Sequence, residues 1–465
     1  MLSEGQSFNT KITPTKEEEQ EYLAYDRPEK FFENLEGGLS SLDTLKENSG
    51  IKSPVLICGG MAAFDKGILD FLNAWSRKEK DLFLLSEVTA QYRRYTNEKI
   101  EFAHICTPHL LAKEMVLRDM EIETSSEMLR LPRKKRYVHE AVQNTKMRYG
   151  TLGRGYAEAW CWYAYQYIIK LLDILEPRKV ILWNEFYAFH HIFQGICLEK
   201  EIPLEYMEFG CIPGTFVIEK NGQQGESLIA SDPEKFKCLP VSAAEEEQAG
   251  KVINYLCEAG LNRNPQPENV FIKKMISGYK PGRPIVTYMG QNDFESGFYP
   301  YTKRTRKFHS PVFKNTLDAL EYLSRLAVKN GWNLVYKPHP IMKSLGHAGS
   351  PEQMELFRAA QVGDTDINSL IDESDVVVTI LSQSAYIALI RGKPVVMLGY
   401  TQLRGKGCTY EAFGRRVIEG TIKSAVKKEN FSEHLKNFRR HVACILKYYL
   451  YDDMTQRSLR FGRKL

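Results

Sequence analysis

Two short polar runs carry residue types that suit the binding of a phosphate. Lys337 and His339 follow one apolar run, and Ser382, Gln383 and Ser384 follow another. In open α/β sheets, ligands lie beyond the carboxyl ends of the strands. The start of a helix adds unpaired N–H groups and the positive end of a dipole. We therefore expect two adjacent strand ends to form a site for a ligand that carries a phosphate.

The two prolines around His339 favour a fixed position for its imidazole. Proline restricts its own φ, and it also restricts the residue before it. Pro338 and Pro340 thus hold His339 in an extended backbone. The alternatives are a structural loop histidine and, for the serines, a plain helix N-cap.

Carboxylates follow two strands predicted earlier in the chain. Glu208 precedes Phe209 and Gly210 after the strand predicted at 204–207, and Asn184 and Glu185 follow the strand at 179–183. A carboxylate at such a position can take a proton from an acceptor hydroxyl if its pKa suits the task. We predict catalytic roles for Glu208, Glu185 and His339, with a solvated surface carboxylate as the alternative for Glu208.

Four other residues follow predicted strands and could approach the same ligand. Gly59 and Gly60 permit a tight turn and close backbone approach. Gln291 and Asn292 begin a polar segment that could close over a nucleotide.

Other catalytic and metal-binding motifs are lacking. His190 and His191 are adjacent in a predicted helix and would point about 100° apart, which does not suit one metal ion. The sequence contains neither a Walker loop nor a G-x-S-x-G elbow. We therefore predict no metal site.

Alternating apolar strands and amphipathic helices must position these residues. Strands are predicted at 54–58, 81–86, 179–183, 204–207, 285–289, 334–336, 376–380 and 394–398, and the main helices at 66–75, 155–175, 189–200, 245–261, 315–330, 367–371, 385–391 and 430–453. This alternation of strands and helices is typical of βαβ units. It predicts a polar arm (1–50), a first Rossmann-like domain (51–270), a second one that binds the nucleotide (280–425) and a helical tail (426–465). We expect a ligand cleft between the two domains.

Composition excludes several classes of protein. The 465 residues are 43% hydrophobic and 26% charged, as in ordinary globular proteins. The net charge of +5 is mild for this length and does not indicate a nucleic-acid partner. The nine cysteines are odd in number and lack C-x-x-C spacing, which predicts free thiols in a reducing compartment.

The sequence predicts a cytoplasmic protein. The first twenty residues are polar and acidic, unlike a signal peptide, and no apolar run approaches the ~20 residues of a membrane span. Two basic patches could contact a membrane surface, or could be ordinary solvated surface. They comprise Arg130, Arg133, Lys134, Lys135 and Arg136, and in the tail Arg457, Arg460, Arg463 and Lys464.

The order and spacing of several motifs resemble the capsular polysaccharide biosynthesis and export family. They are Trp183-Asn184, the segments 208–216, 222–227 and 290–297, Lys337 to Pro340, and Ser382 to Pro394. The motif set is similar to that of Kdo transferases and of bacterial sialyltransferases and polysialyltransferases. The resemblance spans roughly residues 50–420.

The resemblance implies a metal-independent glycosyltransferase of the GT-B fold, with C-terminal helices packing back. It implies a CMP-linked donor of Kdo or sialic acid, no other cofactor, and a glycan or glycolipid acceptor at the inner membrane face. In such enzymes the histidine and serines contact the nucleotide, which assigns that role to His339, Ser382 and Ser384, and the acidic-x-Gly carboxylate corresponds to Glu208. Sialyltransferases often have two acids before the glycine, whereas this chain has Glu208-Phe209.

Two other functions remain open at this point. One is a CDP-polyol phosphotransferase of teichoic-acid type, which also has an His-Pro element and a strand ending in serine. The other is a non-catalytic scaffold in a capsule assembly complex, for which we expect no response to nucleotides.

Overall fold

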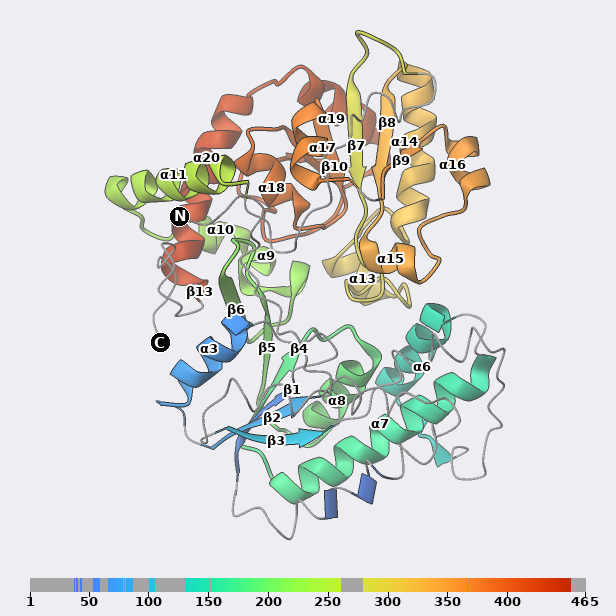
Figure 1. Cartoon of the computed structure of the whole chain (residues 1–465), viewed down its shortest axis with the longest axis vertical. Helices are drawn as coiled ribbons and strands as arrows, with labels where there is room; N and C mark the ends of the chain where they lie inside the picture. The colour runs from blue at the N-terminus through green and yellow to red at the C-terminus, as the bar shows by residue number, and fades with distance from the viewer. Residues whose placement is uncertain are drawn as a thin grey trace, which may run out of the picture.

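The computed structural model of the chain has two α/β domains, one above the other in Figure 1. It describes residues 53–58, 66–77, 79, 81–86, 100–104, 130–149, 153–260, 279–363 and 365–452, with a few residues between 37 and 43. The predicted polar arm and the Gly59-Gly60 turn therefore lie almost wholly outside the described residues. In the described part, no helix combines the length and apolar character needed to cross a membrane.

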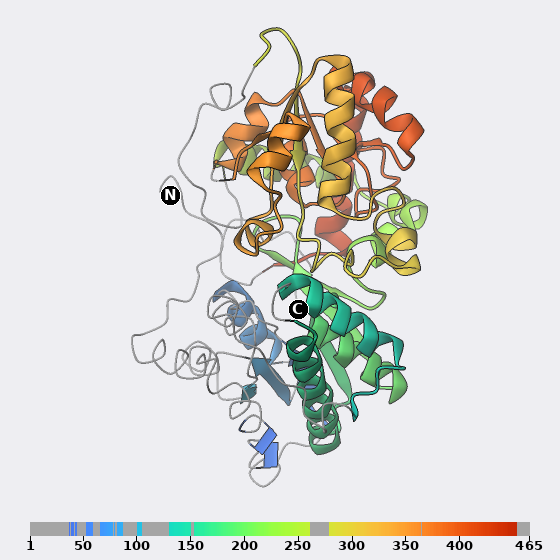
Figure 2. The same cartoon turned by 90° about the vertical axis from the view of Figure 1, so that its right-hand side faces the viewer.

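The first domain is built on a seven-stranded sheet in the order β13-β6-β5-β4-β1-β2-β3. Its strands are β1 (Val55–Cys58), β2 (Leu82–Ser86), β3 (Ile100–His104), β4 (Lys179–Trp183), β5 (Leu204–Phe209), β6 (Thr215–Glu219) and β13 (Tyr451–Asp452). Its helices are α3 (Lys66–Trp75), α6 (Arg136–Tyr149), α7 (Gly153–Leu175) and α8 (Ala188–Glu199). The strands from β3 to β5 are parallel, whereas β6 and β13 are added antiparallel. Figure 2 shows α6, α7 and α8 together on one side of this domain.

The second domain is built on a six-stranded parallel sheet in the order β12-β11-β10-β7-β8-β9. Its strands are β7 (Ile285–Met289), β8 (Asn333–Lys337), β9 (Ala360–Gln361), β10 (Val376–Thr379), β11 (Val395–Met397) and β12 (Tyr410–Glu411). Its helices are α13 (Lys303–Phe308), α14 (Thr316–Asn330), α15 (Pro340–Ser344), α16 (Pro351–Phe357), α17 (Ile367–Glu373), α18 (Ser384–Ile390), α19 (Arg415–Val426) and α20 (Phe431–Tyr448).

Local sequence explains most of these elements. Every residue of β1, β7 and β10 is buried, because parallel strands are covered on both faces and their sequences are continuous apolar runs. Helix α14 begins where Asn315 accepts a hydrogen bond from the backbone N–H of Asp318. It ends at Gly331, whose φ of 69° favours glycine.

The segment that joins the domains enters the second domain early. It contains η4 (Gln224–Glu226), α9 (Leu228–Ser231), α10 (Pro233–Lys237) and α11 (Ala243–Glu258). Helix α11 lies beside α20 in Figure 1 and also contacts α18. The crossing into the second domain thus precedes residue 243, whereas the sequence placed it near 270.

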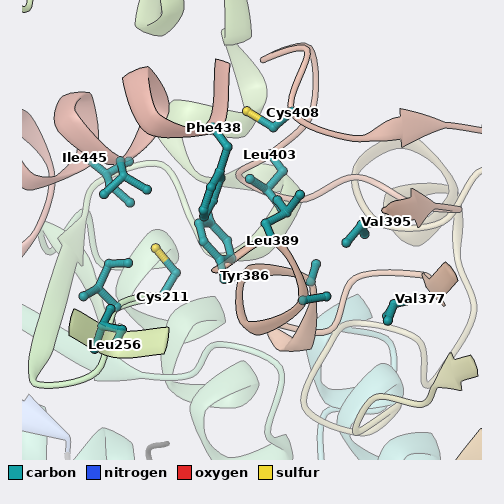
Figure 3. Packing of buried hydrophobic residues seen from close by; sticks show 14 of the residues in the cluster. Cys211, Leu256, Val377, Tyr386, Leu389, Val395, Leu403, Cys408, Phe438 and Ile445 are labelled. Carbon is teal, nitrogen blue, oxygen red and sulfur yellow. The ribbon is translucent and has the colours of Figure 1, made fainter. Parts of the chain in front are cut away.

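A shared core holds this crossing region together. Figure 3 shows Phe438 of α20 against Tyr386 of α18, with ring centroids 6.0 Å apart, and Leu256 of α11 in the same cluster. After α20 the chain returns to the first domain, where Tyr451 of β13 pairs with Phe216 of β6. Two Rossmann-like domains with a C-terminal helix that packs back are the GT-B arrangement that the resemblance implied.

Candidate active site at the domain interface

The two strand ends that carry the predicted phosphate site are not adjacent. Strand β7 lies between β8 and β10, so the expectation of neighbouring strands is wrong. Both ends nevertheless stop at one level of the sheet, because Lys337 and Thr379 are each in register with Met289. With strands about 4.8 Å apart, these backbones lie roughly 10 Å from each other across β7. A ligand that reaches both must span the end of β7.

His339 has one ring nitrogen left for a ligand. It occupies the N-cap of α15, and its Nδ1 accepts a hydrogen bond from the backbone N–H of Ile341 at 3.3 Å. The proton of the neutral imidazole is therefore on Nε2. Burial lowers the pKa of His339 below its ordinary value, and the negative charge of Glu295 opposes this shift. At neutral pH the residue is a neutral donor through Nε2–H.

The serine turn has a similar pattern of donors and acceptors. The Ser382 hydroxyl oxygen accepts from the backbone N–H of Ser384 at 3.3 Å and from its hydroxyl at 3.0 Å. Among the described residues, none accepts the hydroxyl proton of Ser382, which is half-buried. Gln383 is also half-buried beside it, at the start of α18. The N-cap residue of α18 is Gln383 and neither serine, so the structure does not show the N-cap alternative, and Ser382 keeps a donor hydroxyl.

Lys337 holds a neighbouring loop. Its Nζ donates to the carbonyl oxygens of Gly363 at 3.2 Å and Thr365 at 2.7 Å. These bonds fix the loop after β9 against the end of β8. The predicted contact between Lys337 and a phosphate is therefore not part of this arrangement and stays a prediction.

Gln291 and Asn292 are turned into the protein. Gln291 donates to Asp293 at 2.6 Å and to the Thr316 hydroxyl at 2.9 Å, and the side-chain oxygen of Asn292 accepts from the N–H of Phe294. Asp293 caps the start of α14 by accepting from Thr316, while burial raises the pKa of Asp293 to about 6. These contacts hold the loop after β7 and do not support a direct nucleotide contact by Gln291 or Asn292.

Glu185 lies in an interdomain ion cluster, which we define as Glu185, Glu226, Arg304 and His309. Glu185 follows β4, has a relative exposure of 0% and pairs with the guanidinium of Arg304 from α13. It also accepts from Gln194 and from the backbone N–H of Gln223, both at 2.8 Å. Glu185 is buried and fully engaged, so this geometry gives it a structural position and does not support the predicted catalytic role.

The rest of the ion cluster completes the bridge between the domains. Glu226 accepts from Arg304 Nε at 2.6 Å and lies 3.1 Å from His309 Nε2. Burial would raise the pKa of Glu226, but its hydrogen bonds with His309 and Arg304 lower it. Phe186 packs edge-on against the His309 ring at 5.0 Å.

Two glycines, Gly222 and Gly225, let the joining segment pack closely against Glu185 and α13. Gly222 has φ of +132°, and a Cβ there would lie 2.9 Å from an oxygen of Glu185. A Cβ on Gly225 would lie 1.6 Å from the carbonyl oxygen of Phe308 in α13. Backbone of the joining segment thus touches backbone of the second domain at Gly225.

A second bridge links the first domain to the loop after β7. The buried Arg148 of α6 pairs with Glu295 at 3.1 Å and packs over the rings of Tyr187 and Phe294. The Asn184 side chain donates to the carbonyl oxygen of Glu295 at 3.0 Å. Asn184 therefore helps to position the loop that carries Glu295, whose negative charge acts to raise the pKa of His339.

Glu208 is half-buried on β5, opposite Val217 of the antiparallel strand β6. Its strand reaches past the end of β4, since Trp183 is in register with Met207. Glu208 therefore lies near the carboxyl edge of the first sheet, but within β5 and not after the strand as predicted, and its catalytic role stays a prediction.

The adjacent histidines diverge, as the helical geometry predicts. His190 Nδ1 contacts the carbonyl oxygen of Asn184 at 2.7 Å, and burial lowers the pKa of His190 to about 4. His191 instead contacts Glu140 at 3.0 Å.

The first basic patch is largely neutralised by acidic neighbours. Arg133 pairs with Glu158 at 2.8 Å, Lys135 with Glu199 at 2.5 Å, and Arg136 with Glu140 at 2.7 Å. This pairing favours the ordinary-surface alternative for that patch, and the tail patch lies outside the described residues.

Three hollows meet at Arg304, where α8 approaches α13. Two are open grooves of about 650 and 560 Å³, and the third is a cavity of about 40 Å³ beside His309. The sequence analysis did not identify Arg304, Glu226 or His309. Glu226 lies in one motif of the resemblance, but its partners are distant in sequence.

Residues 301–444 match the family model described as capsule polysaccharide biosynthesis protein. The match covers less than a third of the chain and includes Lys337, His339, Ser382 and the cluster residues Arg304 and His309. It confirms the predicted resemblance to a capsular polysaccharide family. No curated protein matches the chain.

Several solved structures are similar at low identity. The β-Kdo 2,7 transferase of Thermosulfurimonas dismutans KpsC is 19% identical, with 62% of this chain and 82% of that chain covered and a TM-score of 0.39. The β-Kdo 2,4 transferase of the same protein is 14% identical, with 58% and 80% covered and a TM-score of 0.39. The S. aureus MnaA–UDP co-structure is 8% identical, with 85% and 94% covered and a TM-score of 0.34.

Proposed function

We propose that this chain is a metal-independent glycosyltransferase of capsule polysaccharide biosynthesis that uses a CMP-linked sugar, Kdo or a sialic acid. The observation that carries the proposal lies in the second domain, within the family match. There, two donor groups that point to no acceptor among the described residues, His339 Nε2–H and the Ser382 hydroxyl, flank one strand end.

These two groups suit the phosphate of the departing nucleotide. When the bond between the sugar carbon and the phosphate oxygen breaks, CMP leaves with the electron pair and negative charge grows on the phosphate. Fixed donors aimed at a developing charge lower the barrier, because they need no reorganisation during the reaction. The separation of roughly 10 Å between the strand ends lets one group contact the phosphate and the other reach the ribose or a second oxygen.

The acceptor comes from the side of the first domain. Its hydroxyl oxygen forms the new bond to the sugar carbon and loses a proton, which Glu208 takes as the general base. Glu185 acts indirectly, since its ion pair with Arg304 holds α13 against the first domain. We place the reaction on the cytoplasmic face of the membrane, where the acceptor glycolipid and capsule assembly proteins would be available.

A melting-temperature panel tests the donor class. We expect CMP and CDP to stabilise the protein and UMP, GMP and AMP to have little effect. A ligand at 100 times its Kd contributes about 2.7 kcal/mol, which gives a measurable shift. A flat panel would favour the scaffold alternative, and an equal response to all nucleotides would contradict the cytidine assignment.

The His339→Ala variant tests the site. It should bind CMP at least ~10-fold more weakly, a loss of about 1.4 kcal/mol, and transfer should fall by at least as much. His139→Ala is the matched control, because His139 is exposed on α6. If CMP affinity is unchanged in His339→Ala, the role given to His339 is wrong.

Product analysis separates the two transferase reactions. A glycosyltransferase releases CMP from a CMP-sugar and leaves the sugar on the acceptor. A polyol phosphotransferase releases CMP from a CDP-polyol and leaves a polyol phosphate. Mass spectrometry of the acceptor product distinguishes a mass increase of one sugar from that of a polyol phosphate.

A further inference from the structure

The two open grooves beside Arg304 form one elongated groove. They share Gln194, Leu198 and Arg304, so one continues into the other past Leu198. Each volume, about 650 and 560 Å³, is typical of a complete small-molecule site. The combined groove is therefore large enough in volume for several sugar residues.

The wall from the second domain is cationic. Lys303 and Lys307 of α13 line the larger part, and both are exposed. Within the described part of the chain, neither lysine lies within ion-pair distance of a carboxylate. Arg304 between them is neutralised by Glu185 and Glu226. The uncompensated positive charge of this wall thus comes from the two lysines.

The wall from the first domain is partly apolar and firmly held. Leu198 of α8 is 65% exposed, although large apolar side chains usually avoid water. The Tyr137 ring lies directly over Gly195 of α8, where a Cβ would come within 2.2 Å of the ring. The Tyr137 hydroxyl donates to Glu199 at 3.0 Å, which fixes the ring further.

The charges are distributed unevenly along the groove. The larger part is lined by four cationic side chains and two carboxylates, and the smaller part by two of each. Exposed cations attract anions over about 8–10 Å at moderate salt. An occupant should therefore place an acidic group against α13 and an uncharged part near Tyr206.

We infer that this groove binds the acceptor as an extended glycan whose sugar residues carry carboxylates. The carboxylates would pair with Lys303 and Lys307, and the apolar faces of the sugar rings would pack on Tyr137 and Leu198. The groove begins at the interdomain ion cluster, two of whose members, Arg304 and Glu226, line it. The assignment as acceptor rests on the proposed function, whereas the binding itself does not.

Direct binding to the full chain tests the inference without any catalysis. The probes are tetragalacturonate, which carries four carboxylates, and maltotetraose, a neutral glycan of the same length. We expect calorimetry to show at least tenfold tighter binding of tetragalacturonate at low salt, with the difference shrinking as salt is raised. Equal affinity for the two probes would overturn the inference.

Variants of α13 locate the binding. Lys303→Ala with Lys307→Ala should weaken tetragalacturonate binding about tenfold, and the double change to Arg should restore most of it. Arg306→Ala is the matched control, because Arg306 is exposed on the same helix but does not line the groove. An unchanged affinity in the double Ala variant, or an equal loss in Arg306→Ala, would overturn the inference.

The CMP melting panel, run on the same variants, separates this inference from the proposed function. The double Ala variant should keep the shift produced by CMP, since the lysines lie outside the nucleotide site. If the wild type binds tetragalacturonate but does not respond to CMP, the groove stands and the proposed function fails. If it responds to CMP but does not distinguish the probes, the inference alone fails.

Discussion

The strand-end site in the second domain and the interdomain ion cluster use similar residues in opposite ways. In the cluster, Glu185 accepts from Arg304, Gln194 and the backbone N–H of Gln223, and Glu226 contacts Arg304 and His309, so both carboxylates are engaged within the protein. At the strand ends, His339 and Ser382 each use an acceptor internally and keep a donor hydrogen. Polar groups that satisfy one another hold the domains together, and groups with a remaining donor can bind a ligand. This contrast predicts that variants of the cluster affect stability, whereas variants of the strand ends affect binding.

The largest expected effect is on stability, from Arg304→Met. Removing the guanidinium leaves Glu185, with 0% exposure, as a buried charge without its partner. Loss of one partner of a buried ion pair costs about 3–5 kcal/mol of unfolding free energy. Urea unfolding measures this cost, and Arg306→Met is the control. A loss below about 1 kcal/mol would contradict the structural role of the cluster.

A second stability effect depends on pH and involves Glu219 of β6. Burial raises the pKa of the Glu219 carboxyl from its ordinary value of 4.5 to about 7. The folded state therefore binds an extra proton between these values, so the free energy of unfolding falls as pH rises from about 4.5 to 7 and then levels off. Glu219→Gln removes this dependence, and relative to wild type it should gain about 3 kcal/mol at pH 8 compared with pH 4.5. Chemical unfolding at both pH values measures the difference, and a parallel response of the two proteins would contradict it.

The smallest effect concerns the two serines, and it sharpens the contrast within one site. Ser382→Ala should weaken CMP binding about tenfold, or about 1.4 kcal/mol, because it removes a free donor. Ser384→Ala should change CMP affinity less, since the Ser384 hydroxyl already donates to Ser382. Calorimetric titration with CMP measures the affinity of each variant, and we expect Ser382→Ala to bind CMP more weakly than Ser384→Ala. The reverse order would show that the ligand displaces the internal bond.

Strands that are buried on both faces were predictable from the sequence. The structure places β7 at Ile285–Met289 and β4 at Lys179–Trp183, the ranges predicted from their mostly apolar residues. The other predicted parallel strands differ from their predictions by a residue or two, and β3, β9 and β12 were not predicted. Strands β6 and β13 were missed because each forms only by antiparallel pairing with an existing edge of the sheet, which the local sequence does not indicate. Helix α6 was missed because its sequence is polar over much of its surface, and the basic residues before it read as a surface patch.

The candidate site was predictable in part for a related reason. His339 and Ser382 stand out because proline and serine mark strand ends locally. The order of strands in the sheet is not local, so the intervening β7 was not foreseen. Glu185 and Arg304 are 119 residues apart and Glu226 and Arg304 are 78 apart, with no periodic pattern that relates them. Glu185 was noticed for its position after a strand, but its burial depends on a helix from the other domain.

Gly225 allows the joining segment to lie directly against α13 of the second domain. The missing methyl group at this position is the space that the Phe308 carbonyl oxygen fills. Side chains of increasing size at residue 225 should push the joining segment and α13 apart by increasing distances. A series from Ala through Val to Leu would therefore increase the distance between the joining segment and α13 in steps. The turnover rate can then be measured as a function of that distance.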